Sequence, residues 1–158
     1  MIDEAHVQQI VAYHLALLDA ARKAAAARTG PGPAEVWDRD IGPLMHDLEQ
    51  ESRAYSAAYN SFIGSGKLIC AKNEAGITVE WSEHRRDCAR LQIDPHSRVV
   101  VCMIDVGTRH EPVPIAVRAE DHVLVLLVNG EPASVSEAVT YLLDSFTAQL
   151  TQAECEAL

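Results

Sequence analysis

The apolar residues of this chain repeat with two different periods, and the change between them limits the folds that the chain can adopt. From residue 3 to residue 60 they recur every three to four positions, as in amphipathic helices. After Gly64-Ser65-Gly66 they alternate with polar residues, as in strands with one buried face. The helical period returns after residue 134. Helices therefore flank a central block of strands, which predicts an α+β fold.

Residues 1–60 are predicted to form a helical hairpin. The first helix covers Asp3–Arg28, and Thr29-Gly30-Pro31-Gly32-Pro33 ends it because proline cannot continue a helix. The second helix is expected to be interrupted at Gly42-Pro43. The linker between the helices is short, which favours an antiparallel arrangement. His14 falls on the apolar stripe of the first helix and is expected to be packed rather than exposed.

Residues 64–130 are predicted to form an antiparallel meander of five or six strands, because the connections between consecutive strands are short. The expected strands are 67–72, 76–82, 88–93, 98–106, 112–118 and 122–128. Two of them, 98–106 and 122–128, are apolar on both faces. Strands of this kind are buried on both sides, so both faces at the centre of the sheet are expected to be covered.

A C-terminal helix is predicted over residues 134–150. Ser134 and Glu137 form the S-x-x-E pattern of a capping box, and the residues that follow are apolar on one face. We expect this amphipathic helix to pack on the sheet and the chain to fray from Thr151 onward. With 158 residues and an ordinary apolar fraction of 48%, residues 1–158 are predicted to form a single domain.

The charge of the chain limits its partners. The net charge is −10, and neither half of the sequence carries an excess of basic residues. Proteins that bind nucleic acid or anionic membranes rely on lysine and arginine clusters. The sequence therefore predicts no nucleic-acid partner and no membrane partner. The longest unbroken apolar runs, Val99–Ile104 and Val123–Val128, are far shorter than the roughly 20 residues of a membrane span.

The four cysteines are expected to be reduced. Cys70, Cys88, Cys102 and Cys155 show no C-x-x-C spacing, and the N-terminus lacks the pattern of a secretory signal. These features predict a cytoplasmic protein, and the alanine- and arginine-rich composition suggests a bacterial source. We expect no metal and no cofactor, because the sequence contains none of the usual zinc, phosphate-loop, dinucleotide or serine-hydrolase motifs.

The stretch EWSEHRRDC, residues 80–88, has the densest group of reactive side chains. We interpret it as a solvated bend, with Glu83–Asp87 connecting two strands. His84, Asp87 and Cys88 are nevertheless candidate ligand-binding residues. A catalytic cysteine needs a base within hydrogen-bond reach, and a spacing of four residues across a bend does not impose that contact.

A second group of candidates lies at the end of the apolar strand 98–106. A carboxylate at Asp105 is costly to bury unless it is paired, and Arg109 is the expected partner. Asp105 and Arg109 are therefore candidate ligand-binding residues at the rim of the sheet. The polar residues Thr108–Glu111 are expected to form a loop before the next strand.

Two families resemble this chain in part. Small acidic secretion chaperones are similar in size and charge but arrange their helices and strands in another order. Helix-grip ligand-binding proteins are similar in placing a C-terminal helix over a sheet but lack the leading hairpin. Neither resemblance covers the whole pattern, so neither assigns a function.

The sequence favours a non-enzymatic protein-interaction module that acts as a homodimer, with a further protein as a possible partner. The surplus apolar strand surface and the missing catalytic motifs support this hypothesis. The alternative is a small-molecule-binding module with a cavity between the sheet and the C-terminal helix. A third hypothesis is an enzyme that uses His84, Asp87, Cys88 or Asp105.

Overall fold

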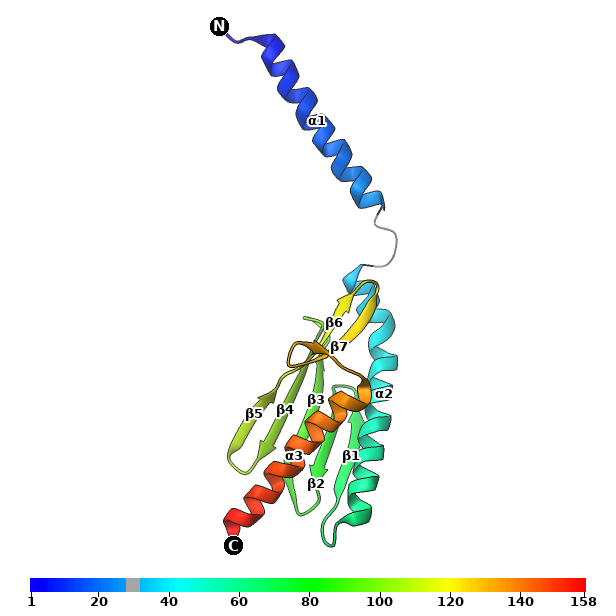
Figure 1. Cartoon of the computed structure of the whole chain (residues 1–158), viewed down its shortest axis with the longest axis vertical. Helices are drawn as coiled ribbons and strands as arrows, with labels where there is room; N and C mark the ends of the chain where they lie inside the picture. Colours follow the sequence, from blue (N-terminus) through cyan, green and yellow to red (C-terminus); the bar gives the residue numbers. More distant parts are fainter. Residues whose placement is uncertain (28–31) are drawn as a thin grey trace. The chain divides into compact units, whose positions relative to one another are not determined.

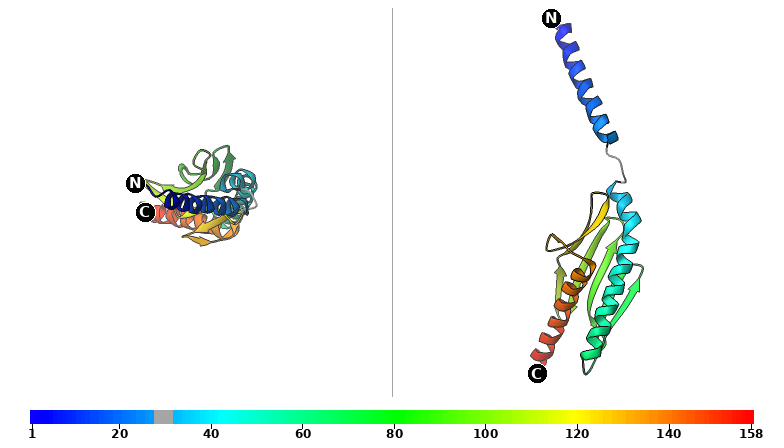
Figure 2. Two further views of the ribbon diagram at one scale, coloured as in Figure 1. Left: turned by 90° about the horizontal axis from the view of Figure 1, so that it is seen from above. Right: turned by 45° about the vertical axis from the view of Figure 1, so that its right-hand side comes forward.

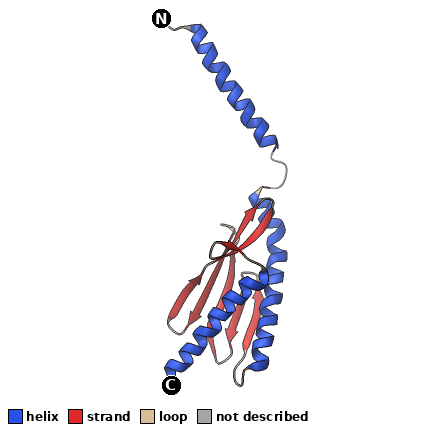
Figure 3. Ribbon diagram, viewed as in Figure 1, coloured by secondary structure: helices blue, strands red, loops and turns tan. Residues whose placement is uncertain are grey.

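The computed structural model describes residues 1–27 and 32–158, which belong to two compact units, Met1–Pro31 and Gly32–Leu158. Helix α1 (Glu4–Ala27) forms the first unit. The second unit contains, in chain order, α2 (Pro33–Phe62), β1 (Leu68–Asn73), β2 (Gly76–Trp81), β3 (His84–Asp94), β4 (Val99–Val106), β5 (Arg109–Val113), β6 (Ile115–Glu120), β7 (Val123–Val128), β8 (Glu131–Pro132) and α3 (Val135–Ala157). Helices flank a central run of strands, so the predicted α+β class is confirmed (Figures 1 and 3).

Helix α1 begins where the sequence predicts. Asp3 caps it, because Asp3 Oδ1 accepts hydrogen bonds from the backbone N–H groups of Ala5 (3.1 Å) and His6 (3.4 Å). Every described side chain of α1 is exposed, including His14, so the packing predicted for this histidine is not provided by the described residues of one chain. The expected helix end at 28–31 lies outside the described residues. Met1–Pro31 and Gly32–Leu158 are separate compact units, and the helical hairpin and the single domain therefore stay predictions.

Helix α2 runs without interruption through Gly42-Pro43, so the predicted break there is wrong. A proline normally disfavours helical geometry at the preceding residue because its ring meets that residue's Cβ, and Gly42 has no Cβ. The helix is also fixed on both sides of the proline. Val36 and Trp37 before it and Met45 and Leu48 after it are buried. This burial outweighs the one backbone hydrogen bond that the proline cannot form.

Strands β1 to β5 form one antiparallel sheet in sequence order, so the predicted meander is confirmed for five strands. The register of these strands places alternate residues of each strand on the inner face of the sheet. Leu91 of β3 lies opposite Ile77 of β2 and Cys102 of β4, and all three are almost completely buried. The buried residues of α2 and α3 join the same core, and both helices lie on this face of the sheet (Figure 2). The predicted packing of the C-terminal helix on the sheet is confirmed.

The expected strand 112–118 is divided between two sheets. Pro114 separates β5, the last strand of the five-stranded sheet, from β6, the first strand of a three-stranded sheet β6-β7-β8. Proline has no N–H to donate to a strand ladder, so it marks a point where pairing can change partners. The expected loop Thr108–Glu111 is also wrong, because Gly107 and Thr108 make the turn and β5 begins at Arg109.

Helix α3 starts as predicted, since the hydroxyl of Ser134 accepts a hydrogen bond from the Glu137 N–H at 3.1 Å. It continues to Ala157, so the predicted fraying from Thr151 is wrong. Leu150 is buried and Ala153 packs against the core, which holds the last turns on the sheet. The side chain of Gln152 also accepts a hydrogen bond from Arg109 of β5 at 3.2 Å.

The outer face of the five-stranded sheet is apolar along β4. Val99 and Val101 point outward with 42% and 45% of their surface exposed, and Met103 beside them is half-buried. Because α2 and α3 share the inner face, the described residues of the second unit place no helix over this side. The expected cover on both faces of the sheet is thus not provided by this unit alone.

Candidate functional site

The stretch Glu80–Cys88 crosses from β2 to β3 by a shorter turn than expected. Only Ser82 and Glu83 form the turn, and β3 begins at His84, so the predicted bend over Glu83–Asp87 is wrong. The extra residues form a bulge instead. The pairing moves from Glu80 opposite Cys88 to Trp81 opposite His84, which leaves residues 85–87 without partners on β2. Bulges of this kind often redirect side chains near functional sites.

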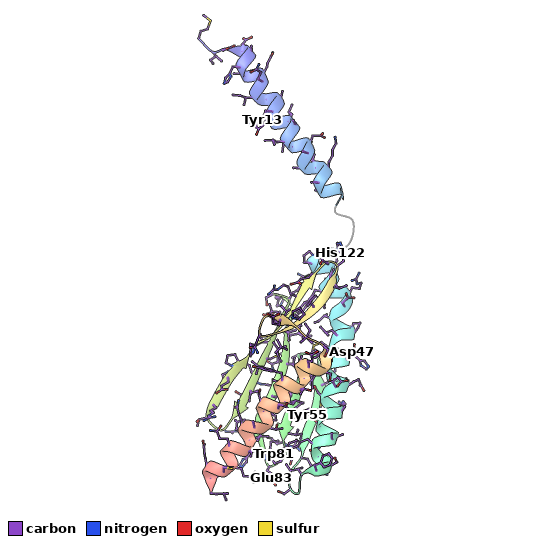
Figure 4. All side chains as sticks on the ribbon, in the orientation of Figure 1. Tyr13, Asp47, Tyr55, Trp81, Glu83 and His122 are labelled. Atoms are coloured by element: carbon purple, nitrogen blue, oxygen red, sulfur yellow. The ribbon has the colours of Figure 1, made fainter. Side chains whose placement is uncertain are left out.

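A pocket of about 340 Å³ opens beside this bulge, between the end of the sheet and the last turns of α3. The residues that define its chemistry are Tyr59, Trp81, His84, Asp87, Leu150 and Glu154. They come from α2, β2, β3 and α3. Figure 4 shows Trp81 and Glu83 at this end of the sheet. The structure therefore brings two of the predicted site residues, His84 and Asp87, to one pocket.

The pocket is lined by apolar and by acidic side chains. Ile63, Leu150 and the rings of Tyr59 and Trp81 supply the apolar surface, whereas Glu83, Asp87 and Glu154 supply carboxylates. Asp87 is oriented by the backbone N–H of Gly107, which donates to its Oδ1 at 2.9 Å. Burial, together with the charge of Glu154, raises the pKa of Tyr59, so its hydroxyl stays neutral. An apolar group with a positively charged end suits this combination.

A second hollow of about 370 Å³ lies next to the pocket and shares Tyr59 and Ile63 with it. The ring of Tyr55 stacks near that of Tyr59, with centroids 6.4 Å apart. The Tyr55 hydroxyl donates to Asp144 Oδ1 of α3 at 2.7 Å, and burial is the main cause that raises the pKa of Tyr55 to about 12. This hydrogen bond joins α2 to α3 at the edge of the hollow.

Asp105 lies on the outer face of the sheet, away from this pocket. Arg90 of β3 donates to Asp105 Oδ2 at 2.5 Å, and Nδ1 of His110 on β5 contacts Asp105 Oδ1. The expected partner Arg109 points to the other face and donates to Gln152. Adjacent residues of a strand face opposite sides, which is why His110 rather than Arg109 reaches the carboxylate. The expected Arg109–Asp105 pair is therefore replaced by an Arg90–Asp105–His110 cluster.

Cys88 is also on the outer face, directly opposite Asp105 in the register of β3 and β4. It is buried, and burial is the main cause that raises the pKa of its thiol. A thiol with a raised pKa is a weak nucleophile, because only the thiolate attacks. The five predicted site residues thus lie in three places, at the pocket, on the outer face, and between β5 and α3.

Of the six residues that define the chemistry of the pocket, the sequence identified only His84 and Asp87 as site candidates. Tyr59 and Trp81 fall on the apolar faces of the predicted second helix and of the predicted strand 76–82, and both are partly buried against the core. Leu150 and Glu154 fall at and beyond the expected end of the C-terminal helix. If the predicted helix had been extended over residues 135–157, Glu154 would have been placed near the sheet.

Metal-binding side chains do not gather in groups of three or more anywhere within 1–27 and 32–158. The absence of a metal and of a cofactor stays a prediction. Among the helices of the same described ranges, none combines the length and apolar character needed to cross a bilayer.

Comparisons with protein-family models, with curated proteins and with solved structures find no match to this chain.

Proposed function

We propose that this chain is a non-enzymatic protein-interaction module that acts as a homodimer. The observation that carries the proposal is the exposed apolar stripe of α1. Val7, Ile10, Val11, Leu17 and Leu18 are each between 42% and 52% exposed, on a helix of 24 residues. Apolar patches of this extent on soluble proteins usually mark interaction surfaces.

The lack of a stabilising neighbour for α1 among the described residues of one chain supports the same proposal. A helix of 24 residues is about 36 Å long, and all its described side chains are exposed. Helices in proteins derive most of their stability from packing an amphipathic face against another element. A second copy of the chain supplies such a face without requiring a different partner, and twofold self-association is the commonest form of oligomer.

The second unit adds a further apolar area. Val99, Val101 and Met103 form a strip on the outer face of the sheet. Four free cysteines among the described residues suit a reducing compartment, and we include a cytoplasmic location in the proposal.

Light scattering tests the proposed dimer. The full chain is expected to have twice the monomer mass of 17.2 kDa at micromolar concentration. Replacing Val11 and Leu18 together by aspartate places charges in the stripe, and this variant is expected to be monomeric at the same concentration because unpaired charges are costly to bury.

The matched control places the same charges on the opposite side of α1, as Gln9→Asp with Ala16→Asp. This variant is expected to remain dimeric. A wild-type mass near 17.2 kDa that does not rise with concentration would refute the proposed dimer. Equal loss of the dimer in both variants would show that the stripe is not the surface that mediates it.

A second candidate function is the binding of a small organic cation, favoured by the pocket between the sheet and α3. Its aromatic side chains Tyr59 and Trp81 offer cation–π contacts, and Asp87 and Glu154 offer opposite charge. The volume of about 340 Å³ lies at the lower end of the range for ligand sites.

Tryptophan fluorescence checks this second candidate, because Trp81 lines the pocket whereas Trp37 is buried in the core. Benzyltrimethylammonium is expected to change the emission with a saturable dependence, and benzenesulfonate, an anion of similar size, is expected to have little effect. Glu154→Gln should weaken binding of the cation by roughly fivefold, as for loss of one nearby charge close to the surface. Equal responses to the cation and the anion would contradict a cation site.

A further inference from the structure

We propose that α1 pairs with α1 of a second copy in an antiparallel coiled coil. The inference rests on the proposed homodimer and adds its geometry. One line of residues runs along the stripe with spacings of four, three, four, three and four, and it consists of Val7, Val11, His14, Leu18, Ala21 and Ala25. That alternation is the 3.5-residue repeat by which two helices stay in contact along their length.

Side-chain size favours the antiparallel arrangement. The first half of the stripe is wide, with Val7 and Val11, and the second half is narrow, with Ala21 and Ala25. A parallel pair would place alanine against alanine through the second half and leave that end thinly packed. An antiparallel pair places valine against alanine at both ends, which keeps the packing even.

The charges of α1 favour the same arrangement. Asp3 and Glu4 lie at the first turn, whereas Arg22 and Lys23 lie near the last turn against a single acid, Asp19. Lys23 already pairs with Asp19 at 3.1 Å in the helix. In a parallel pair the two acidic ends meet each other. In an antiparallel pair each acidic end lies toward the basic end of its neighbour, and the helix dipoles also oppose favourably.

One register aligns the full length of both helices. When Val7 of one copy lies opposite Ala25 of the other, Val11 lies opposite Ala21 and His14 opposite Leu18. The twofold axis then passes near residue 16, and Leu15 and Leu17 of the two copies flank it. Both leucines are more than half exposed, at 61% and 52%, so this register also covers them.

Distances between spin labels test the arrangement in the full-length protein. The labels are attached to a single cysteine introduced at Gln9 or at Ala16, with Cys70 and Cys155 replaced by serine and the buried Cys88 and Cys102 kept. Both sites lie on the side of α1 away from the stripe. In the proposed register the two Gln9 positions are offset by about 21 Å along the axis, and the two Ala16 positions by about 0 Å.

The expected result is a clearly longer distance for the Gln9 label than for the Ala16 label. Equal distances would mean a parallel pair and overturn the inference, while the homodimer stands. A dimer by light scattering that gives no short distance for the Ala16 label would mean contact through another surface, which also overturns the inference alone. A monomer would overturn both the inference and the proposed function.

Discussion

Replacing Phe146 by alanine is expected to lower the free energy of unfolding by about 3–5 kcal/mol. Phe146 lies in α3 with none of its surface exposed, and it belongs to the core cluster that joins α2, α3 and the sheet. Truncation removes the apolar ring and leaves a cavity that the surrounding side chains fill only in part. Urea denaturation followed by circular dichroism measures the change.

The chain has a second phenylalanine that serves as a matched control. Phe62 ends α2 and is 91% exposed, so Phe62→Ala makes the same chemical change without opening a cavity. We expect it to alter the free energy of unfolding by less than about 0.5 kcal/mol. Similar losses for the two variants would mean that α3 is not packed on the sheet as described.

Replacing Gly76 by alanine is expected to cost about 3 kcal/mol or more of folding free energy. Gly76 has a φ of +153° and lies opposite Gln92 in the pairing of β2 and β3. A Cβ atom there would lie 1.9 Å from the backbone carbonyl oxygen of Leu91, which belongs to a central strand and has little room to move. The substitution therefore forces β2 and β3 apart at the start of the ladder.

Gly107→Ala measures the cost of a positive φ for alanine without the steric clash that alanine meets at Gly76. Gly107 also has a positive φ, of +61°, but a Cβ there would meet nothing within 4 Å. Alanine at this position is expected to cost about 1–2 kcal/mol, the penalty of left-handed geometry alone. Denaturant midpoints of the two variants compare the effects, and an equal cost at both positions would contradict the close approach of Gly76 to Leu91.

The order of helices and strands could be predicted from the sequence because it depends on local periodicity. Alternation over residues 76–82 predicted β2, and Ile77 and Val79, which share one face of this strand, are both buried. The S-x-x-E pattern at Ser134 predicted the start of α3. These signals lie within a few residues of one another, so no knowledge of distant contacts is needed to interpret them.

The wrong predictions concern positions whose structure depends on contacts between residues that are far apart in the sequence. Gly42-Pro43 is a local signal for a helix break, yet buried residues on both sides keep α2 continuous. The end of α3 has no local signal, and its last turns are held by β5 and the core. Pro114 divides one expected strand between two sheets, because the chain changes pairing partners there.

At the candidate site, too, local features could be predicted from the sequence and contacts between distant residues could not. His84 and Asp87 were candidates from the sequence. Their pocket neighbours Tyr59 of α2 and Leu150 and Glu154 of α3 were not, since these residues lie far along the chain. Asp105 was expected to need a partner, and it has two. The strand register makes Arg90 and His110 the partners of Asp105 rather than the nearby Arg109, because only side chains on the same face of the sheet can contact each other.

The sequence by itself determined the class of fold, the sign of the charge and the amphipathic faces, since each depends on residue type and spacing alone. Only the tertiary structure decided which faces are covered. Helices α2 and α3 both take the inner face of the sheet, which leaves Val99 and Val101 exposed. Periodicity shows that a face is apolar but not what covers it, because the choice among covering elements depends on the packing of segments distant in sequence.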